Sequence, residues 1–196
     1  MTGVQTCALP ISYVELFREK NVPLETEETK LGQQYQEMMG ALTVDFQGEE
    51  KTLVQMGVYL QENDRALRQE AWELVAKKRL EVADACDEQF EKLMALRVQI
   101  AANAGFKDYR EFKHISKGRF DYQPDDCFKF HEAVETLVMP LYNQLLSERR
   151  ESMQLNALRP WDTGVDPLGR APLKPFTEVD DMVARTKNIF NHVDDE

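Results

Sequence analysis

The spacing of apolar residues between Asp64 and Gly105 constrains the fold of this chain more than any other feature. Apolar side chains recur there at intervals of mostly three and four residues, which places them along one side of an α-helix. They are Leu67, Ala71, Leu74, Val75, Val82, Cys86, Phe90, Leu93, Met94, Ile100 and Ala104. Asn63 or Asp64 can cap the start of the helix, and Gly105 can supply the left-handed backbone that ends it. A continuous helix of about 40 residues would be roughly 60 Å long, so we expect a break near Arg79 and Leu80, or a bend.

The rest of the chain predicts further helices and one small hairpin. Pro23 and the acidic residues behind it are typical of a helix start, and this helix should run to about Gly40. Residues 41–53 alternate apolar and polar side chains around a glycine, as the strands of a hairpin do. Further helices are expected from Leu53 to Leu60, from Tyr109 to Lys117, from Pro124 to Arg150 and from Thr177 onward, with a kink about one turn before Pro140.

Residues 156–176 are rich in Pro, Gly and Asp and predict an ordered loop. Trp161 and Phe176 are expected to anchor this loop in neighbouring structure. Together these patterns predict a mainly α fold, a bundle of long helices with one small β-hairpin. The composition, with 42% hydrophobic and 30% charged residues, is that of an ordinary globular chain able to form a core.

The charge of the chain excludes some classes of partner. Its formal net charge is -11, whereas nucleic acids and anionic membrane surfaces are bound by clustered Lys and Arg. No apolar run approaches the roughly 20 residues that a membrane-spanning helix needs. We therefore expect no nucleic-acid partner and no membrane partner.

The cysteines indicate a reducing compartment, so a cytoplasmic location is expected. Cys7 lies in residues 1–11, which match the translation of a sequencing adapter and are interpreted as non-native. Cys86 and Cys127 remain, each on the apolar stripe of its own predicted helix. Buried structural thiols are expected there, rather than a nucleophile or a metal pair.

The histidines lack the spacing of a zinc site. An H-E-x-x-H sequence, which puts two imidazoles on one face of a helix, is absent. His131 begins a similar run, but the fifth position is Glu135, so a packed histidine on an apolar face is expected. His114 lies among basic residues that would repel a cation and is expected at the surface or in a groove, and His192 has no ligand-spaced neighbour. We assign no catalytic, cofactor-binding or metal-ligating residue.

Two other groups of residues leave alternatives open. Arg110, Lys113, Lys117 and Arg119 form the one basic cluster in an acidic chain. They could hold a carboxylate such as a peptide terminus, or they could be a solvated face. Trp161 and Asp162 follow a proline in the ordered loop, and packing at a domain junction is the expected role. The acidic residues near Glu25 and at Asp194 to Glu196 are interpreted as helix-start and terminal charges.

Several segments resemble oligoendopeptidase F, a branch of the thimet-oligopeptidase-like zinc metallopeptidases. The longest are NAGFKDYREFKHISKGRFDYQPDDCFKFHEAVE at residues 103–135 and LRPWDTGVDPLGRAPLKPF at residues 158–176. The pieces YVELFREK, VDFQGEEKTL and NDRALRQEAW extend the resemblance, so that it covers nearly everything from about Ser12 to Glu196.

The resemblance implies a larger, two-lobed, mostly helical metalloendopeptidase whose channel admits short peptides and excludes folded proteins. Members bind zinc through the two His of H-E-x-x-H and a Glu from a later helix, and the Glu within the motif activates the zinc-bound water. No residue of this chain matches these positions. Zinc is therefore expected in the full-length parent enzyme and not in this chain, which alone is expected to be inactive.

Both ends of the chain are interpreted as truncations. Residues 12–115 are expected to form the end of the amino-terminal helical lobe, and residues 116–196 the opening helices and loop of the peptidase domain. The alternative is a non-catalytic helical binding or scaffold module that never needed a metal. A stop codon after Glu196 would favour this alternative, whereas H-E-x-x-H further along the same reading frame would favour the peptidase.

Overall fold

The computed structural model describes residues 14–171 and 173–193. The residues interpreted as non-native, Cys7 included, lie outside this part of the chain, as do Asp194 to Glu196. The chain is mainly α with one small antiparallel sheet, as predicted. None of the described helices combines the length and the apolar character that crossing a bilayer requires.

Two long helices pair at the start of the chain. Helix α2 spans Val22–Gly40, follows the 3-10 turn η1 at Glu19–Asn21 and packs against α5, which spans Ala83–Asn103. The buried Asn21 joins them: its amide nitrogen donates to the Ile100 carbonyl over 3.0 Å and its amide oxygen accepts from Asn103 over 2.7 Å. Further along the pair, Arg97 Nε donates to a carboxylate oxygen of Glu28 over 2.8 Å.

The predicted hairpin is present. Strand β1 (Thr43–Phe46) pairs with β2 (Glu49–Thr52), with Thr43 opposite Thr52. Gln47 and Gly48 turn the chain with φ values of 55° and 81°, the left-handed backbone of a tight hairpin turn. Because two strands alone are only marginally stable, the hairpin depends on its packing against the helices that follow it.

The hairpin packs onto a helical unit of two short elements and one long helix. Helix α3 (Leu53–Met56) and the 3-10 turn η2 (Gly57–Gln61) lead into α4 (Arg65–Leu80). Thr52 caps α3 through a reciprocal pair of hydrogen bonds with Gln55. The core of the unit consists of Val44, Phe46, Met56 and Ala71, which are all buried.

The long periodic segment is divided into two helices, as expected. Helix α4 ends at Leu80 and α5 begins at Ala83, one or two residues beyond the predicted break. The carboxylate of Asp64 caps α4 by accepting from two backbone amides. Gly105 follows α5 with a φ of 89°, so the left-handed stop is also confirmed.

The second half of the chain forms a helical arm. Helix α6 spans Tyr109–Ser116, and α7 (Pro124–Ala133) continues through η3 (Val134–Val138) into α8 (Met139–Ser152). The η3 segment is π-helical, with the Met139 amide bonded to the Val134 carbonyl. It lies one turn before Pro140, which has no amide hydrogen to continue the ladder. The expected irregularity of this helix is therefore a π-helical turn.

The last part of the chain departs from prediction at two places. Helix α9 spans Val179–Val193 and begins two residues after the predicted Thr177. Phe176 is 42% exposed, so its predicted role as an anchor is wrong. Trp161, in the 3-10 turn η4 (Pro160–Asp162), does anchor the loop, because its ring lies 5.5 Å from that of Trp72 on α4.

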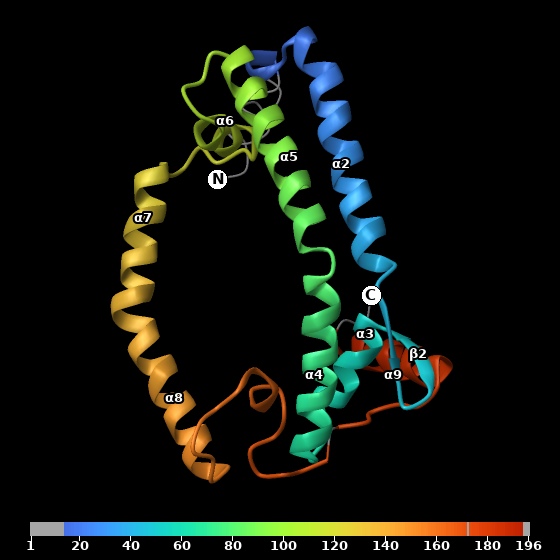
Figure 1. Ribbon diagram of the computed structural model, residues 1–196. Coiled ribbons are helices and arrows are strands. Elements are labelled where there is room, and N and C mark those ends of the chain that lie inside the picture. The colour runs from blue at the N-terminus through green and yellow to red at the C-terminus, as the bar shows by residue number, and fades with distance from the viewer. Residues whose placement is uncertain (1–13, 172, 194–196) are drawn as a thin grey trace.

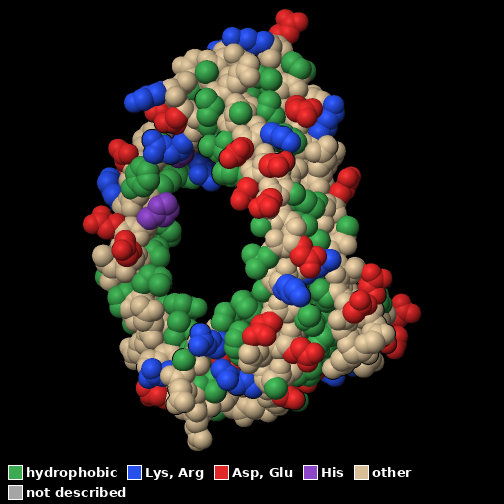
Figure 2. Space-filling model, in the orientation of Figure 1, with side chains coloured by type: hydrophobic (Ala, Val, Ile, Leu, Met, Phe, Trp, Pro, Cys, Tyr) green, Lys and Arg blue, Asp and Glu red, His purple; other side chains and the backbone are tan. Residues whose placement is uncertain are grey.

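These elements surround an opening (Figure 1). Helices α4 and α5 lie end to end on one side, and α7 and α8 lie on the other. Helix α6 joins the two sides at one end, and the loop after α8 joins them at the other. Figure 2 shows that side chains leave the centre of this frame open and that hydrophobic side chains gather along its inner margin.

Candidate functional site

The α7 to α8 arm carries a large apolar surface. Its exposed large hydrophobic residues are Phe128, Phe130, Leu137, Val138, Met139, Leu141, Tyr142 and Leu145. Exposed apolar residues on this scale are typical of a surface that contacts another molecule or another part of a protein. His131 lies on the same arm but is exposed, so the prediction that it is a packed histidine is wrong.

A buried carboxylate stabilises the loop that follows α8, at one end of the frame. Asp162 is fully buried, and its side chain accepts from Arg65 Nε and Nη2, both over 2.9 Å, and from Arg68 Nη2 over 3.2 Å. The backbone amide of Arg159 donates to the same carboxylate over 2.9 Å. Burial acts to raise the pKa of Asp162, but the hydrogen bonds from Arg65, Arg159 and Arg68 outweigh burial and hold it below its usual value.

Two arginines connect this carboxylate to the neighbouring elements. Arg68 is buried on α4 and donates to the carbonyls of Trp161, Glu62 and Asn63. Arg149 on α8 donates through Nε to the Asp162 carbonyl over 2.9 Å and through Nη2 to the Val165 carbonyl. The loop is therefore held by α4 on one side and by α8 on the other. Trp161 and Asp162 thus lie at a junction between helices, and the prediction that this is a junction between domains stays a prediction.

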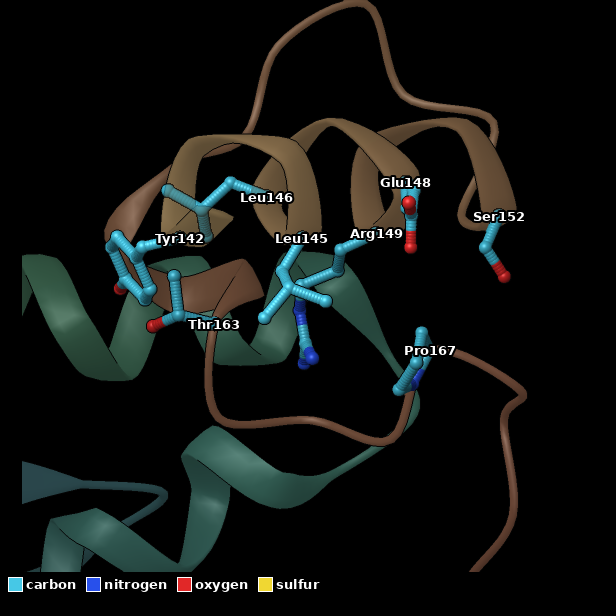
Figure 3. Close-up of a pocket in the computed structure, with 8 residues that line it drawn as sticks. All are labelled: Tyr142, Leu145, Leu146, Glu148, Arg149, Ser152, Thr163 and Pro167. Carbon is cyan, nitrogen blue, oxygen red and sulfur yellow. The ribbon is translucent and has the colours of Figure 1, made fainter. Parts of the chain in front are cut away.

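A shallow cavity of about 440 Å³ lies beside this junction (Figure 3). Its lining residues are Tyr142, Leu145, Leu146, Glu148, Arg149, Ser152, Thr163 and Pro167. The Arg149 side chain points from α8 toward the loop, where its Nε and Nη2 donate to two backbone carbonyls. The cavity thus has an apolar wall from α8 beside an arginine that also holds the loop.

A second cavity, of about 360 Å³, lies where α6 meets α7. The four basic residues singled out in the sequence, Arg110, Lys113, Lys117 and Arg119, all line it. The remaining lining residues are Tyr109, His114, Pro124, Cys127, Phe128 and His131. The structure therefore brings the basic cluster together with two histidines and two aromatic rings. The closeness of the four basic residues in the sequence indicated a basic cluster. The contribution of α7 to the cavity depends on tertiary structure and was not predicted.

Of the two positions predicted for His114, at the surface or in a groove, the structure shows the second. It is only 8% exposed, and its Nε2 lies 2.8 Å from the Tyr122 carbonyl oxygen. Because a carbonyl only accepts, Nε2 carries the hydrogen of this bond. His114 lines the cavity, as a groove histidine would, but it does not lie at the surface.

The residues described here do not fit a zinc centre. Within residues 14–171 and 173–193, no three His, Cys, Asp or Glu side chains are grouped so that they could hold a metal ion. His192 bonds to the Asn188 carbonyl on α9, away from the other two histidines. Cys86 and Cys127 are free thiols that are half-buried, so both are less buried than predicted. We therefore assign no step of metal chemistry to this part of the chain.

Comparison with known proteins identifies the family. A model of peptidase family M3 matches residues 58–193, and the chain belongs to this family. No curated protein matches the chain.

Solved structures share its fold. A crystal structure described as an oligoendopeptidase F from Bacillus anthracis strain Ames superposes with a TM-score of 0.90 and 23% identity, covering 98% of this chain and 35% of that one. Another structure described as an oligoendopeptidase F has a TM-score of 0.91 and 26% identity, covering 98% of this chain and 34% of that one. PZ peptidase A with an inhibitor gives the same TM-score, identity and coverage. The chain thus spans about a third of the length of the structures it matches.

Proposed function

We propose that this chain is part of a zinc metalloendopeptidase that hydrolyses short oligopeptides, as its resemblance to oligoendopeptidase F implies. The observation that carries the proposal is the family match over residues 58–193, supported by a fold that agrees over 98% of the chain. In the whole protein, the zinc ligands and the general base lie outside these 196 residues. Zinc would supply an activated water and polarise the scissile carbonyl.

This part of the protein serves as wall and support for the peptide channel. The opening between the two helical sides has a hydrophobic margin, which suits the apolar side chains of an extended peptide (Figure 2). The junction loop around Asp162 is held to α4 by ion pairs with Arg65 and Arg68 and to α8 by hydrogen bonds from Arg149, which is what a rigid frame requires. A narrow channel of this kind would admit short peptides and exclude folded proteins.

The lobe boundary is proposed near residues 115 and 116. Residues 12–115 then end the amino-terminal lobe, and residues 116–196 open the peptidase domain. Helix α6 ends at Ser116 and α7 begins at Pro124, so a non-helical segment follows the proposed boundary. We propose a cytoplasmic location, which the free Cys86 and Cys127 favour.

Turnover of a quenched fluorescent peptide tests the proposal. The whole protein should cleave a peptide of about ten residues, lose this activity when zinc is chelated and recover it when zinc is returned. It should not cleave a folded protein that contains the same sequence in a loop. The 196-residue chain, purified in parallel, should show no turnover. A whole protein that cleaves neither substrate would favour the helical scaffold module instead, and turnover by the 196-residue chain would refute its assigned inactivity.

A further inference from the structure

The cavity between α6 and α7 has an unusual charge for this protein. The chain as a whole carries 35 acidic and 24 basic residues. Yet the lining of this cavity includes four Lys and Arg side chains and two histidines, and no Asp or Glu. Figure 2 shows basic side chains and a histidine together on the margin of the opening. The cavity is therefore an electropositive site in an otherwise acidic molecule.

Most of these cations have no partner within the described residues. Lys113, Lys117 and Arg119 form no ion pair there. Arg110 lies 3.7 Å from Asp108, but that carboxylate also caps α6 by accepting from the Glu111 amide. Repulsion between like charges three and four residues apart on a helix costs stability. An anion in the cavity would remove this cost.

The helix alone does not account for the cluster. Lys113 lies in the last turn of α6, where a cation is favoured by the helix dipole. Arg119, however, lies beyond the end of the helix at Ser116 and still lines the cavity. Cations from two different segments thus converge on one space.

Aromatic rings form the other wall. The guanidinium carbon of Arg110 lies 5.4 Å from the centroid of the Phe128 ring, and Lys113 Nζ lies 6.0 Å from that of Tyr109. The Tyr109 hydroxyl is held by Glu28 over 3.3 Å. Phe128 is about half exposed, so a ligand can reach its ring. Cations beside accessible aromatic rings suit a ligand with both a negative charge and an apolar group.

We propose that this cavity binds the carboxyl-terminal residue of a peptide, with its carboxylate among Lys113, Lys117 and Arg119 and its side chain against Phe128. The volume of about 360 Å³ lies in the range of small-ligand pockets. Inorganic phosphate shares the negative charge but has no apolar group for the aromatic wall. The assignment of a peptide as the ligand rests on the proposed function, whereas the anion site itself rests on the cavity.

A binding experiment on the 196-residue chain tests this without a metal or turnover. Calorimetry would compare N-acetyl-Ala-Ala-Phe, with a free carboxylate, and the same peptide as the amide. The amide should bind at least about 10-fold more weakly, since a lost charge-assisted contact is worth roughly 1.4 kcal/mol or more. The difference should shrink as salt is raised from about 0.05 to 0.5 M, because salt screens exposed charges.

Three variants in the cavity and one control variant localise the site. Lys113→Gln and Arg119→Gln should each weaken binding of the acid by about 3- to 10-fold and leave binding of the amide unchanged. Lys187→Gln removes an equal charge from α9, at the opposite end of the molecule from α6, and should change neither (Figure 1). Phe128→Ala should weaken binding of the peptide acid but should not weaken binding of inorganic phosphate. Circular dichroism would establish that each variant is folded.

Several outcomes would overturn the proposal. Equal affinities for acid and amide would exclude a carboxylate site. Phosphate binding with no preference for the peptide acid would assign the cavity to a free anion instead. An equal loss in the α9 variant would mean that net charge, and not this cavity, controls binding. None of these outcomes depends on whether the whole protein is a zinc peptidase, which turnover measures separately.

Discussion

Replacing Asp162 with alanine should lower the free energy of unfolding by about 3–5 kcal/mol, because it removes one partner of a buried ion pair. Asp162 is fully buried and Arg68 is 2% exposed, so the arginine would keep its charge without a nearby carboxylate. The loop would also lose its acceptor for the Arg159 amide. Urea denaturation followed by circular dichroism measures the loss.

An exposed pair and a pH series serve as controls for Asp162. Glu27→Ala breaks the exposed pair with Lys30 and should cost at most about 1 kcal/mol. The pKa of Asp162 is lowered by folding, so its stabilisation is complete above the unfolded value of about 3.9 and is lost as pH falls below it. The wild-type chain should therefore lose more stability between pH 7 and pH 3 than Asp162→Ala. Equal losses would contradict the assigned role of this carboxylate.

Phe46→Ala should also destabilise the chain by about 3–5 kcal/mol, the usual cost of removing a buried phenyl ring. Phe46 is 1% exposed, and its ring lies 4.7 Å from that of Tyr59 in an edge-to-face contact. Phe46 packs the hairpin against the helical residues of the same core. Two strands alone are only marginally stable, so the hairpin would lose much of its support without this ring. Thermal unfolding should begin at a lower temperature and hydrogen exchange in β1 and β2 should accelerate.

Val54→Ala is the matched control for Phe46. Val54 lies next to the hairpin but is 88% exposed, so its truncation should change stability by no more than about 0.5 kcal/mol. If both variants lost the same stability, the buried cluster around Phe46 would not be the element that holds the hairpin.

The sequence predicted the local structure of the chain well because local structure has local causes. The cap at Asp64, the stop at Gly105, the hairpin turn at Gln47 and Gly48 and the irregular turn before Pro140 all follow from the conformational preferences of neighbouring residues. The break after Leu80 and the start of α9 at Val179 each lay slightly beyond the expected position.

Errors arose where burial depends on distant segments. His131 lies on an apolar sequence pattern and Phe176 ends the ordered loop, yet both are exposed because the described residues provide no neighbour to cover them. The pairing of Arg65 and Arg68 with Asp162 joins residues 97 and 94 positions apart, and no local pattern indicates it. The Pro160–Trp161–Asp162 run pointed to a junction but not to its partners.

The candidate anion site was predictable only in part. Arg110, Lys113, Lys117 and Arg119 lie close together in the sequence, so a basic cluster could be inferred. The contribution of Phe128 to that cluster could not, because it depends on how α7 leaves α6. The sequence therefore indicated the charge of the site, and the structure added its aromatic wall.

Zinc content tests the central claim most directly. The whole protein and the 196-residue chain would be purified in parallel and their metal measured by mass spectrometry. The account predicts about one zinc per molecule of the whole protein, as in other single-site zinc peptidases, and less than about a tenth per molecule of the chain. Stoichiometric zinc in the 196-residue chain, or none in the whole protein, would contradict it.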